Sequence, residues 1–407
     1  MYFWRSLWFS CNAWISNYRS DLETIRNFRK RNNYKSLIVS SQQNIWDRIQ
    51  RDLWIGLAFV VLFLVLPAFD PGKYFLTQIT LFFIWAAVVT QWNLVFGVGG
   101  IFSLGHMAIF AIGGYVMAMM GLYNEWNLWA AMIVGGITAV IFSFLMGVLT
   151  LRLRGPYVAV MTLAIAQVMH ALIVTDVECY FKKEMICINF TGGAKGIMKF
   201  GDFGFKDWLG YKYVVFGNYY LALALFVIGS IFAFSIMYSS LGATFRAVRD
   251  HTICAETRGV DRRRAQLLLF SVSGFFTGLA GGVYGGIYRT VGPDTLTLPV
   301  LLFLLSMMVI GGRGTHWGPV LGAGALMLAD TTLRGIGDFR IAGLSLIIIL
   351  SIIFLPRGLV GLVYDIFHWK PRSLIQFRER SVDLRKFQRD RKTKKFNLRY
   401  IGKTSSL

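Results

Sequence analysis

Long apolar blocks separated by short polar gaps occupy most of the chain. A helix needs about 20 apolar residues to cross a bilayer, and it bonds all of its own backbone groups. The pattern therefore predicts an all-α integral membrane protein, a polytopic bundle of about eight to ten transmembrane helices. Blocks shorter than a full span leave re-entrant half-helices as an alternative to complete crossings. The blocks are 53–69, 74–91, 106–120, 127–150, 157–175, 213–237, 265–288, 299–310, 319–328 and 341–355.

The same pattern divides the chain into three regions. A basic tail covers 1–52, a transmembrane domain covers 53–363, and a second basic tail covers 364–407. Two polar insertions, at 176–212 and at 239–264, interrupt the transmembrane domain.

The placement of charge predicts the orientation in the membrane. The chain carries 42 Lys and Arg against 21 Asp and Glu, although 55% of its residues are hydrophobic. The cations gather in both tails, around 152–154 and in 239–264. In a nucleic-acid-binding protein, such a positive charge would lie on a domain with the composition of a soluble protein. Here the basic residues flank apolar blocks, as the positive-inside rule predicts for a membrane protein. We therefore expect both termini and 239–264 in the cytoplasm, with 176–212 on the outer face.

Signatures of catalysis are absent from the sequence. The string 402–404 lacks the first glycine and the preceding strand of a P-loop, and no cysteine pair has the spacing of a metal site, so we expect no enzyme activity and no metal. Cys179 and Cys187 either form a disulfide or remain free thiols. His106 and His170 lie inside apolar blocks, and we interpret both as hydrogen-bonded interior histidines rather than a proton relay.

The insertion 239–264 predicts two short helices at the membrane surface, a feature that we call the elbow. Ser239 or Ser240 can cap the first helix, Asp250 can cap the second, and Gly259 would end it. Such a projection can transmit force from a soluble partner to the membrane helices. The alternative is a plain basic loop held by lipid phosphates.

Glycines spaced four residues apart predict close packing of helices, because residues four apart share one helix face. They occur at positions 274, 278, 282 and 286, and again at 314, 318 and 322.

Several strings resemble the LivM-like permease subunits of branched-chain amino acid ABC importers. Each string is weak alone, but together they follow the order and spacing of that family over most of residues 75–362. Two positions depart from the family, which usually has arginine at Ala243 and often a small or apolar residue at Arg313. The matching strings are 93–100, 103–106, 113–115, 151–157, 161–163, 191–196, 201–205, 240–250, 255–256, 259–260, 311–314, 317–323 and 356–358.

The resemblance implies a multi-pass permease of the bacterial cytoplasmic (inner) membrane that forms a path for branched-chain or other hydrophobic amino acids. Its implied partners are a second, LivH-like permease subunit, two cytoplasmic ATP-binding subunits and a periplasmic substrate-binding protein, together with membrane lipid. ATP and Mg would bind the ATP-binding subunits, so the resemblance implies no cofactor on this chain.

Three groups of site residues follow from the resemblance. The residues expected to couple to the ATPase are Gly242, Arg246, Ala247, Arg249, Asp250, Ala255, Glu256 and Gly259. The residues expected to line the translocation path, with helix packing as the alternative, are Ser103, Gly105, His106 and Thr162. The residues expected at the periplasmic mouth are Thr191, Gly192 and Gly193.

Two other functions stay open at this point. The same type of permease could carry urea, short amides or aromatic acids, because the binding protein does most of the selecting in such importers. A stand-alone secondary carrier or channel would need intramembrane charges or a filter-like string, and the sequence shows neither.

Overall fold

The computed structural model describes residues 50, 52–69, 72–153, 155–183, 186–210, 213–336, 339–354 and 358–367. Nearly all of the two predicted basic tails lies outside these residues. The chain divides into two compact units, Met1–Leu76 and Thr77–Leu407.

The described residues of the first unit form the apolar helix Asp52–Phe69, whose last turn is the 3-10 helix η1 (Leu66–Phe69), and the first residues of the next helix. Its mean hydropathy is 2.3. Large apolar side chains such as Leu62 are more than half exposed, as expected for a helix that faces lipid.

Within the described residues, seven helices are long and apolar enough to cross a membrane, which confirms the all-α polytopic class. α3 continues directly into the π-helical turn η2, so the two form one span. Beyond Asp52–Phe69, the spans are α3 (Lys73–Asn93) with η2 (Leu94–Val98), α4 (His106–Tyr123), α5 (Leu128–Thr150), α6 (Pro156–Val174), α8 (Val214–Tyr238) and α11 (Arg262–Tyr288).

The C-terminal helices are shorter, as the short apolar blocks predict. α12 (Leu298–Gly311) has 14 residues, α13 (Gly318–Leu333) and α14 (Phe339–Phe354) have 16 each, and α15 (Gly358–Phe367) has 10. α13 is followed by the 3-10 turn η5 (Arg334–Ile336).

α11 packs against both α4 and α5, and glycine makes this approach possible. A Cβ atom on Gly278 would clash with the Ala139 side chain of α5, and one on Gly113 of α4 would clash with the backbone of Gly278. α12 and α13 meet in the same way at Gly311 and Gly322. The glycine spacing marks helix contacts in α11 and at Gly318 and Gly322 of α13, as predicted. Gly314 is a correction, because it lies in the loop before α13 with a φ of +79° rather than on a helix face.

The insertion 176–212 contains three of the four strands in the described part of the chain, and the fourth, β4 (Thr290–Val291), lies between α11 and α12. β1 (Cys179–Lys183) pairs antiparallel with β2 (Ile186–Asn189). The insertion continues with η3 (Gly193–Lys195), β3 (Ile197–Met198) and α7 (Phe205–Leu209). β3 pairs antiparallel with β4, which is followed by η4 (Pro293–Leu296). The β1–β2 register sets Cys179 opposite Asn189 and Lys182 opposite Cys187, and the disulfide stays a hypothesis.

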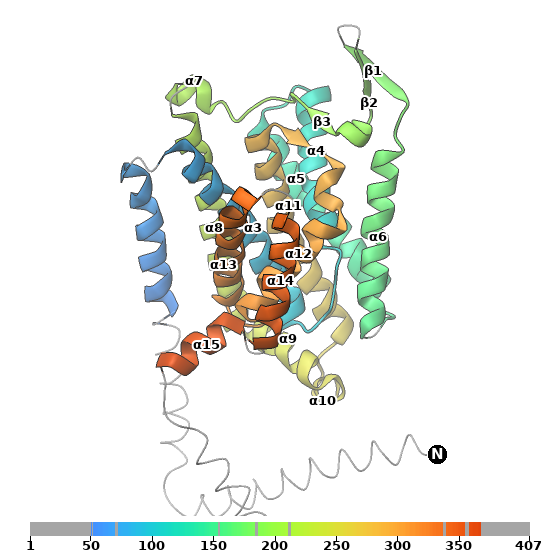
Figure 1. Cartoon of the computed structure of the whole chain (residues 1–407). Coiled ribbons are helices and arrows are strands. Elements are labelled where there is room, and N and C mark those ends of the chain that lie inside the picture. The colour runs from blue at the N-terminus through green and yellow to red at the C-terminus, as the bar shows by residue number, and fades with distance from the viewer. Residues whose placement is uncertain are drawn as a thin grey trace, which may run out of the picture. The chain divides into compact units, whose positions relative to one another are not determined.

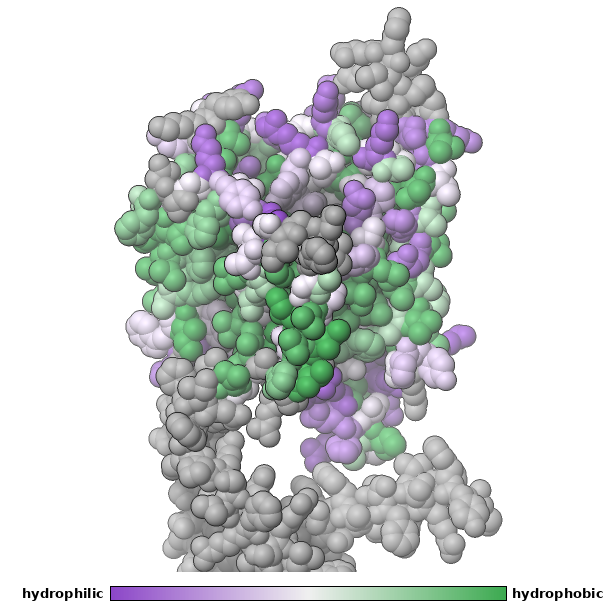
Figure 2. Space-filling view, in the orientation of Figure 1, coloured by the Kyte–Doolittle hydropathy of each residue, from purple (hydrophilic) through white to green (hydrophobic). Residues whose placement is uncertain are grey.

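The elbow forms two short helices, α9 (Ser240–Asp250) and α10 (Thr252–Thr257), as predicted. Figure 1 shows these helices at the end of the second unit opposite the β1–β2 hairpin. In Figure 2, mostly hydrophobic residues cover the middle of the molecule, and hydrophilic residues lie toward its two ends. The hydrophilic residues at one of these ends lie over the elbow. The two polar insertions therefore lie at opposite ends of an apolar bundle.

Candidate functional site

The elbow begins with a sharp reversal after α8. Ser239 caps α9 by accepting a hydrogen bond from the Gly242 backbone nitrogen at 3.5 Å. Gly242 lies so close to the last carbonyl groups of α8 that a Cβ atom would clash with the Ile236 and Met237 oxygens. Arg246 Nη1 donates to the Met237 carbonyl at 2.7 Å. Since the last carbonyls of a helix lack partners within it, Arg246 satisfies one of them and holds α9 against α8.

Phe245 anchors the elbow in the bundle. Its side chain is 3% exposed and belongs to a buried cluster contributed by η2, α8 and α11. The other members of this cluster are Leu94, Val95, Val98, Ala233, Ile236, Met237, Leu269 and Phe270. A buried aromatic side chain of this size stabilises its contact by burying a large apolar area. The elbow is therefore packed into the membrane bundle rather than suspended from it.

Arg249 links the elbow to the end of α3. Its Nη1 donates to the Gly97 carbonyl at 2.7 Å and its Nε pairs with Asp250 at 2.9 Å. The aliphatic part of Arg249 covers Gly100, where a Cβ atom would clash with it. The Arg249 side chain is 34% exposed, so the guanidinium also reaches the surface.

Asn93 continues this link to the loop between α12 and α13. Its side-chain nitrogen donates to the Thr315 carbonyl at 2.9 Å, and its side-chain oxygen accepts from the Gly314 backbone nitrogen at 2.8 Å. Asn93 is 1% exposed. One buried side chain thus joins two segments that are more than 200 positions apart, which makes it a structural clamp.

The second half of the elbow corrects one prediction. Asp250 does not cap α10, because the N-cap is His251, which makes no side-chain cap hydrogen bond. Asp250 is instead the last residue of α9, where its carboxylate pairs with Arg249. Gly259 does end this part of the chain, since it has a φ of +86° that favours glycine.

The remaining predicted coupling residues divide into buried and exposed. Ala255 is the buried residue of α10, whereas Ala247 and Glu256 are exposed. Glu256 lines a cavity of about 290 Å³ between the elbow and the bundle, together with Phe245 and Arg249. The structure therefore brings all of these residues to one end of the bundle, and their role in coupling stays a prediction.

The residues expected along the translocation path are packed together inside the bundle. Ser103, His106 and Thr162 are each 0% exposed. Thr162 Oγ1 accepts from the Leu104 backbone nitrogen at 2.9 Å, and a Cβ atom on Gly105 would clash with Met146. These contacts fit the packing alternative, while a role in the path stays a prediction.

His106 departs from the interpretation as a hydrogen-bonded histidine. Within the described residues, neither of its ring nitrogens has a hydrogen-bond partner. The ring instead stacks on Trp92, with centroids 5.5 Å apart and planes 13° from parallel. Trp92 in turn donates to the Ser103 carbonyl at 2.8 Å. The sequence showed a histidine in an apolar block, but it could not show that an aromatic ring would cover it.

The residues expected at the periplasmic mouth form a tight turn over the end of α6. The Thr191 backbone nitrogen and hydroxyl both donate to one Asp176 oxygen at 2.6 Å. Gly192 and Gly193 follow with positive φ values, and Gly193 is buried against the Asp176 carbonyl. The structure shows how this turn is held, and its contact with a binding protein stays a prediction.

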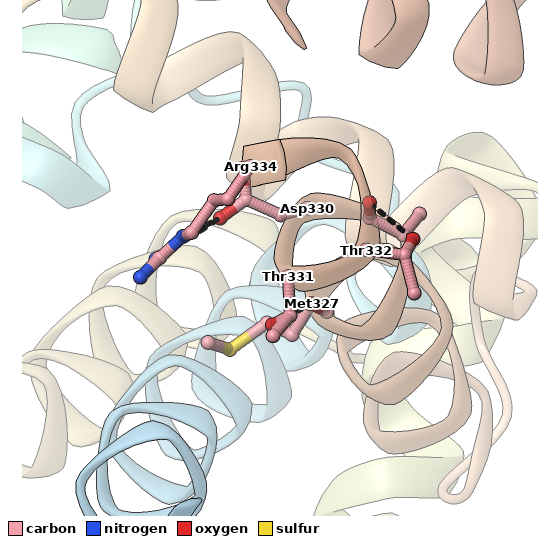
Figure 3. A network of polar contacts seen from close by, with 6 residues as sticks. Met327, Asp330, Thr331, Thr332 and Arg334 are labelled. Atoms are coloured by element: carbon pink, nitrogen blue, oxygen red, sulfur yellow. Dashed lines mark hydrogen bonds and ion pairs between the residues drawn. The ribbon is translucent and has the colours of Figure 1, made fainter. Parts of the chain in front are cut away.

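Sequence reasoning missed a charge pair near the end of α13. Asp330 pairs with Arg334 at 3.2 Å, and the Asp330 side chain is only 7% exposed. Figure 3 shows this pair beside Thr331 and Thr332, whose hydroxyls bond backbone carbonyls of the same helix. The predicted apolar block stops at residue 328, although α13 runs on to Leu333. The i, i+4 spacing of opposite charges was the available signal.

Comparison with known proteins agrees with this architecture. The family described as branched-chain amino acid transport system, permease component, matches residues 74–355, a range that includes the elbow and the Asn93 clamp. The chain is 28% identical over 291 residues to the high-affinity branched-chain amino acid transport system permease protein LivM of Escherichia coli strain K12. The LivM protein of Salmonella typhimurium gives the same identity over the same length.

Each of these alignments covers 66% of this chain and 65% of the relative, so the chain spans just under two thirds of the length of the relatives it matches. No solved structure matches the chain. The family match extends from the first turn of α3 to the end of α14. Because this match covers well over half of the chain, the protein belongs to the family of branched-chain amino acid transport permease components.

Proposed function

We propose that this chain is a permease subunit of an ATP-driven importer in the bacterial cytoplasmic membrane. Its substrates are branched-chain or other hydrophobic amino acids. It works with a second permease subunit, two soluble ATP-binding subunits and a periplasmic binding protein. ATP and Mg bind the ATP-binding subunits, and this chain supplies the membrane path and the surface on which an ATPase docks.

The elbow is the observation that carries this proposal. α9 is fixed to α8 by Arg246, to the buried cluster by Phe245, and to the end of α3 by Arg249. A soluble protein that pushes on the exposed side of the elbow therefore moves several membrane helices together. The names of the two relatives support amino acids as the substrate.

The elbow end faces the cytoplasm in this proposal. Arg152 of the loop between α5 and α6 lines the same cavity as Arg262 and Arg263 at the start of α11. Basic residues from separate gaps thus gather at the elbow end, as the positive-inside rule requires of a cytoplasmic face. Labelling of a cysteine introduced at the exposed Arg258 tests this orientation, because a membrane-impermeant reagent added outside intact cells should leave it unmodified.

Transport by the complete importer in proteoliposomes tests the function. Leucine uptake should require ATP, the ATP-binding subunits and the binding protein. Changing Arg249 to Ala should leave ATP hydrolysis running while uptake falls, because the link between α9 and Gly97 is lost. Uptake by the single chain without ATP would contradict the proposal, and uptake at the wild-type rate in both the Arg246→Ala and Arg249→Ala variants would remove the coupling role of the elbow.

A further inference from the structure

A second surface beside the elbow has the properties of a docking site. A cavity of about 570 Å³ opens next to α9 and is lined by Phe96, Gly97, Gly100, Phe102, Arg249 and Arg313. Arg313 lies in the loop between α12 and α13, outside the elbow. The cavity therefore joins residues from three separate parts of the chain at the end of the bundle where the elbow lies.

The charge of this cavity is one-sided. Among the residues that the structure describes, two guanidinium groups line it and no carboxylate does. Asp250 pairs with Arg249 but is not among the lining residues. Arg313 is exposed, and within the described part of the chain it has no ion-pair partner. Such a site attracts an anion, and a planar guanidinium binds a carboxylate through two parallel hydrogen bonds.

The walls of the cavity add an apolar contact. Phe96 and Phe102 lie with ring centroids 5.0 Å apart, and Phe102 is 37% exposed. A free inorganic anion gains nothing from these rings, whereas a protein segment with an acidic side chain and an apolar neighbour contacts both the rings and the arginines. Aromatic residues and arginine are the side chains that most often dominate the binding energy of protein interfaces.

The position of the cavity suits a partner that drives movement. Arg249 bonds the Gly97 carbonyl, and the residue after Arg313 bonds the Asn93 clamp through its backbone nitrogen. A segment seated in the cavity thus contacts α9, the end of α3 and the α12–α13 loop at once. A partner that contacts only the elbow reaches the α12–α13 loop indirectly, through Arg249 and through η2 with the Asn93 clamp.

We propose that this cavity receives an acidic segment of the soluble ATP-binding subunit, and that Arg313 is a docking residue in addition to those of the elbow. The inference rests on the proposed function, because it takes the ATP-binding subunit to be the partner at this end. Lipid phosphate and the second permease subunit are the competing occupants.

Affinity of the ATP-binding subunit for the membrane complex tests the proposal. Arg313→Glu should weaken binding about tenfold, since a like charge would then meet the acidic segment. Arg313→Gln should weaken it less, and Arg313→Lys should restore part of the affinity because it keeps the charge. Lys195→Glu is the control, since it reverses one exposed charge at the opposite end of the bundle, and it should bind as the wild type does.

The variants separate this inference from the proposed function. If Arg313→Glu and Arg313→Gln both bind like the wild type while Arg249→Glu does not, Arg313 docking is wrong and the elbow assignment stands. If Arg249→Glu also binds and transports normally, the elbow assignment fails with it. Unchanged thermal unfolding of the Gln and Lys variants excludes a folding defect as the cause of lost affinity.

A photo-crosslinking residue at Phe102 identifies the occupant in the complete importer. An adduct on an acidic segment of the ATP-binding subunit supports the proposal. An adduct that carries only lipid, or only the second permease subunit, overturns it.

Discussion

Arg249 and Gly97 are 152 positions apart in the chain, yet the Arg249 guanidinium donates a 2.7 Å hydrogen bond to the Gly97 carbonyl. This bond joins the exposed elbow to η2, the π-helical turn that extends α3. The carbonyl is available because a π-helical turn and the irregular segment after it leave backbone groups outside the regular helical pattern. The Asn93 clamp then connects the same turn to the α12–α13 loop.

Replacement of Asn93 by Ala should uncouple ATP hydrolysis from uptake and lower stability. The change leaves the Gly314 nitrogen and the Thr315 carbonyl without their partner, and a buried unsatisfied group costs about 1–3 kcal/mol. Unfolding of the purified chain and the ratio of amino acid transported to ATP hydrolysed measure the two effects. Asn127→Ala is the control, because it removes the N-cap of α5 at the opposite end and should lower stability without altering that ratio.

Truncation of Phe245 to Ala should detach the elbow from the bundle. Loss of a fully buried aromatic side chain costs about 3–5 kcal/mol, and the neighbouring cluster holds no other residue of α9. Protease cleavage between residues 240 and 260 should become faster than in the wild type. Leu241→Ala, on the exposed face of the same helix, should change neither cleavage nor unfolding. Equal cleavage of the two variants would contradict the anchoring role.

A side chain at position 278 should disrupt the packing of α11. Gly278→Val places methyl groups against Ala139 and the backbone of Gly135, and overpacking of this kind costs about 1–3 kcal/mol. Gly324→Val is the control, because a Cβ atom there has its nearest neighbour, a Phe82 ring carbon, at an ordinary 3.6 Å. Thermal unfolding in detergent compares the two variants, and equal midpoints would show that α11 can move aside.

The pair of Asp330 and Arg334 should show a measurable interaction free energy. A double-mutant cycle with Asp330→Asn and Arg334→Gln isolates it. The Arg334 side chain is 32% exposed while Asp330 is 7% exposed, so solvent screens one partner and we expect about 1 kcal/mol. Free energies of unfolding for the four proteins give the value. Strict additivity of the two single changes would mean that the contact contributes nothing.

The amino-acid sequence alone determined the membrane class, the position of the elbow and the helix contacts made by glycine. These features depend on local pattern. An apolar block long enough to cross a bilayer has few alternatives to a helix. Ser239 caps the helix that directly follows it. Glycines four residues apart in a helix share one face, whichever neighbour that face contacts.

The tertiary structure alone decided which distant groups meet. Nothing next to Asn93 in sequence indicates Gly314, and nothing next to Arg249 indicates Gly97. The Asp250 side chain is of a type that often caps a helix, but its carboxylate pairs with Arg249 at the end of α9. The His106 ring can form hydrogen bonds, but in the structure it stacks on Trp92. Such contacts depend on the path of the whole chain, because side chains with several possible partners bind the one that folding brings within reach.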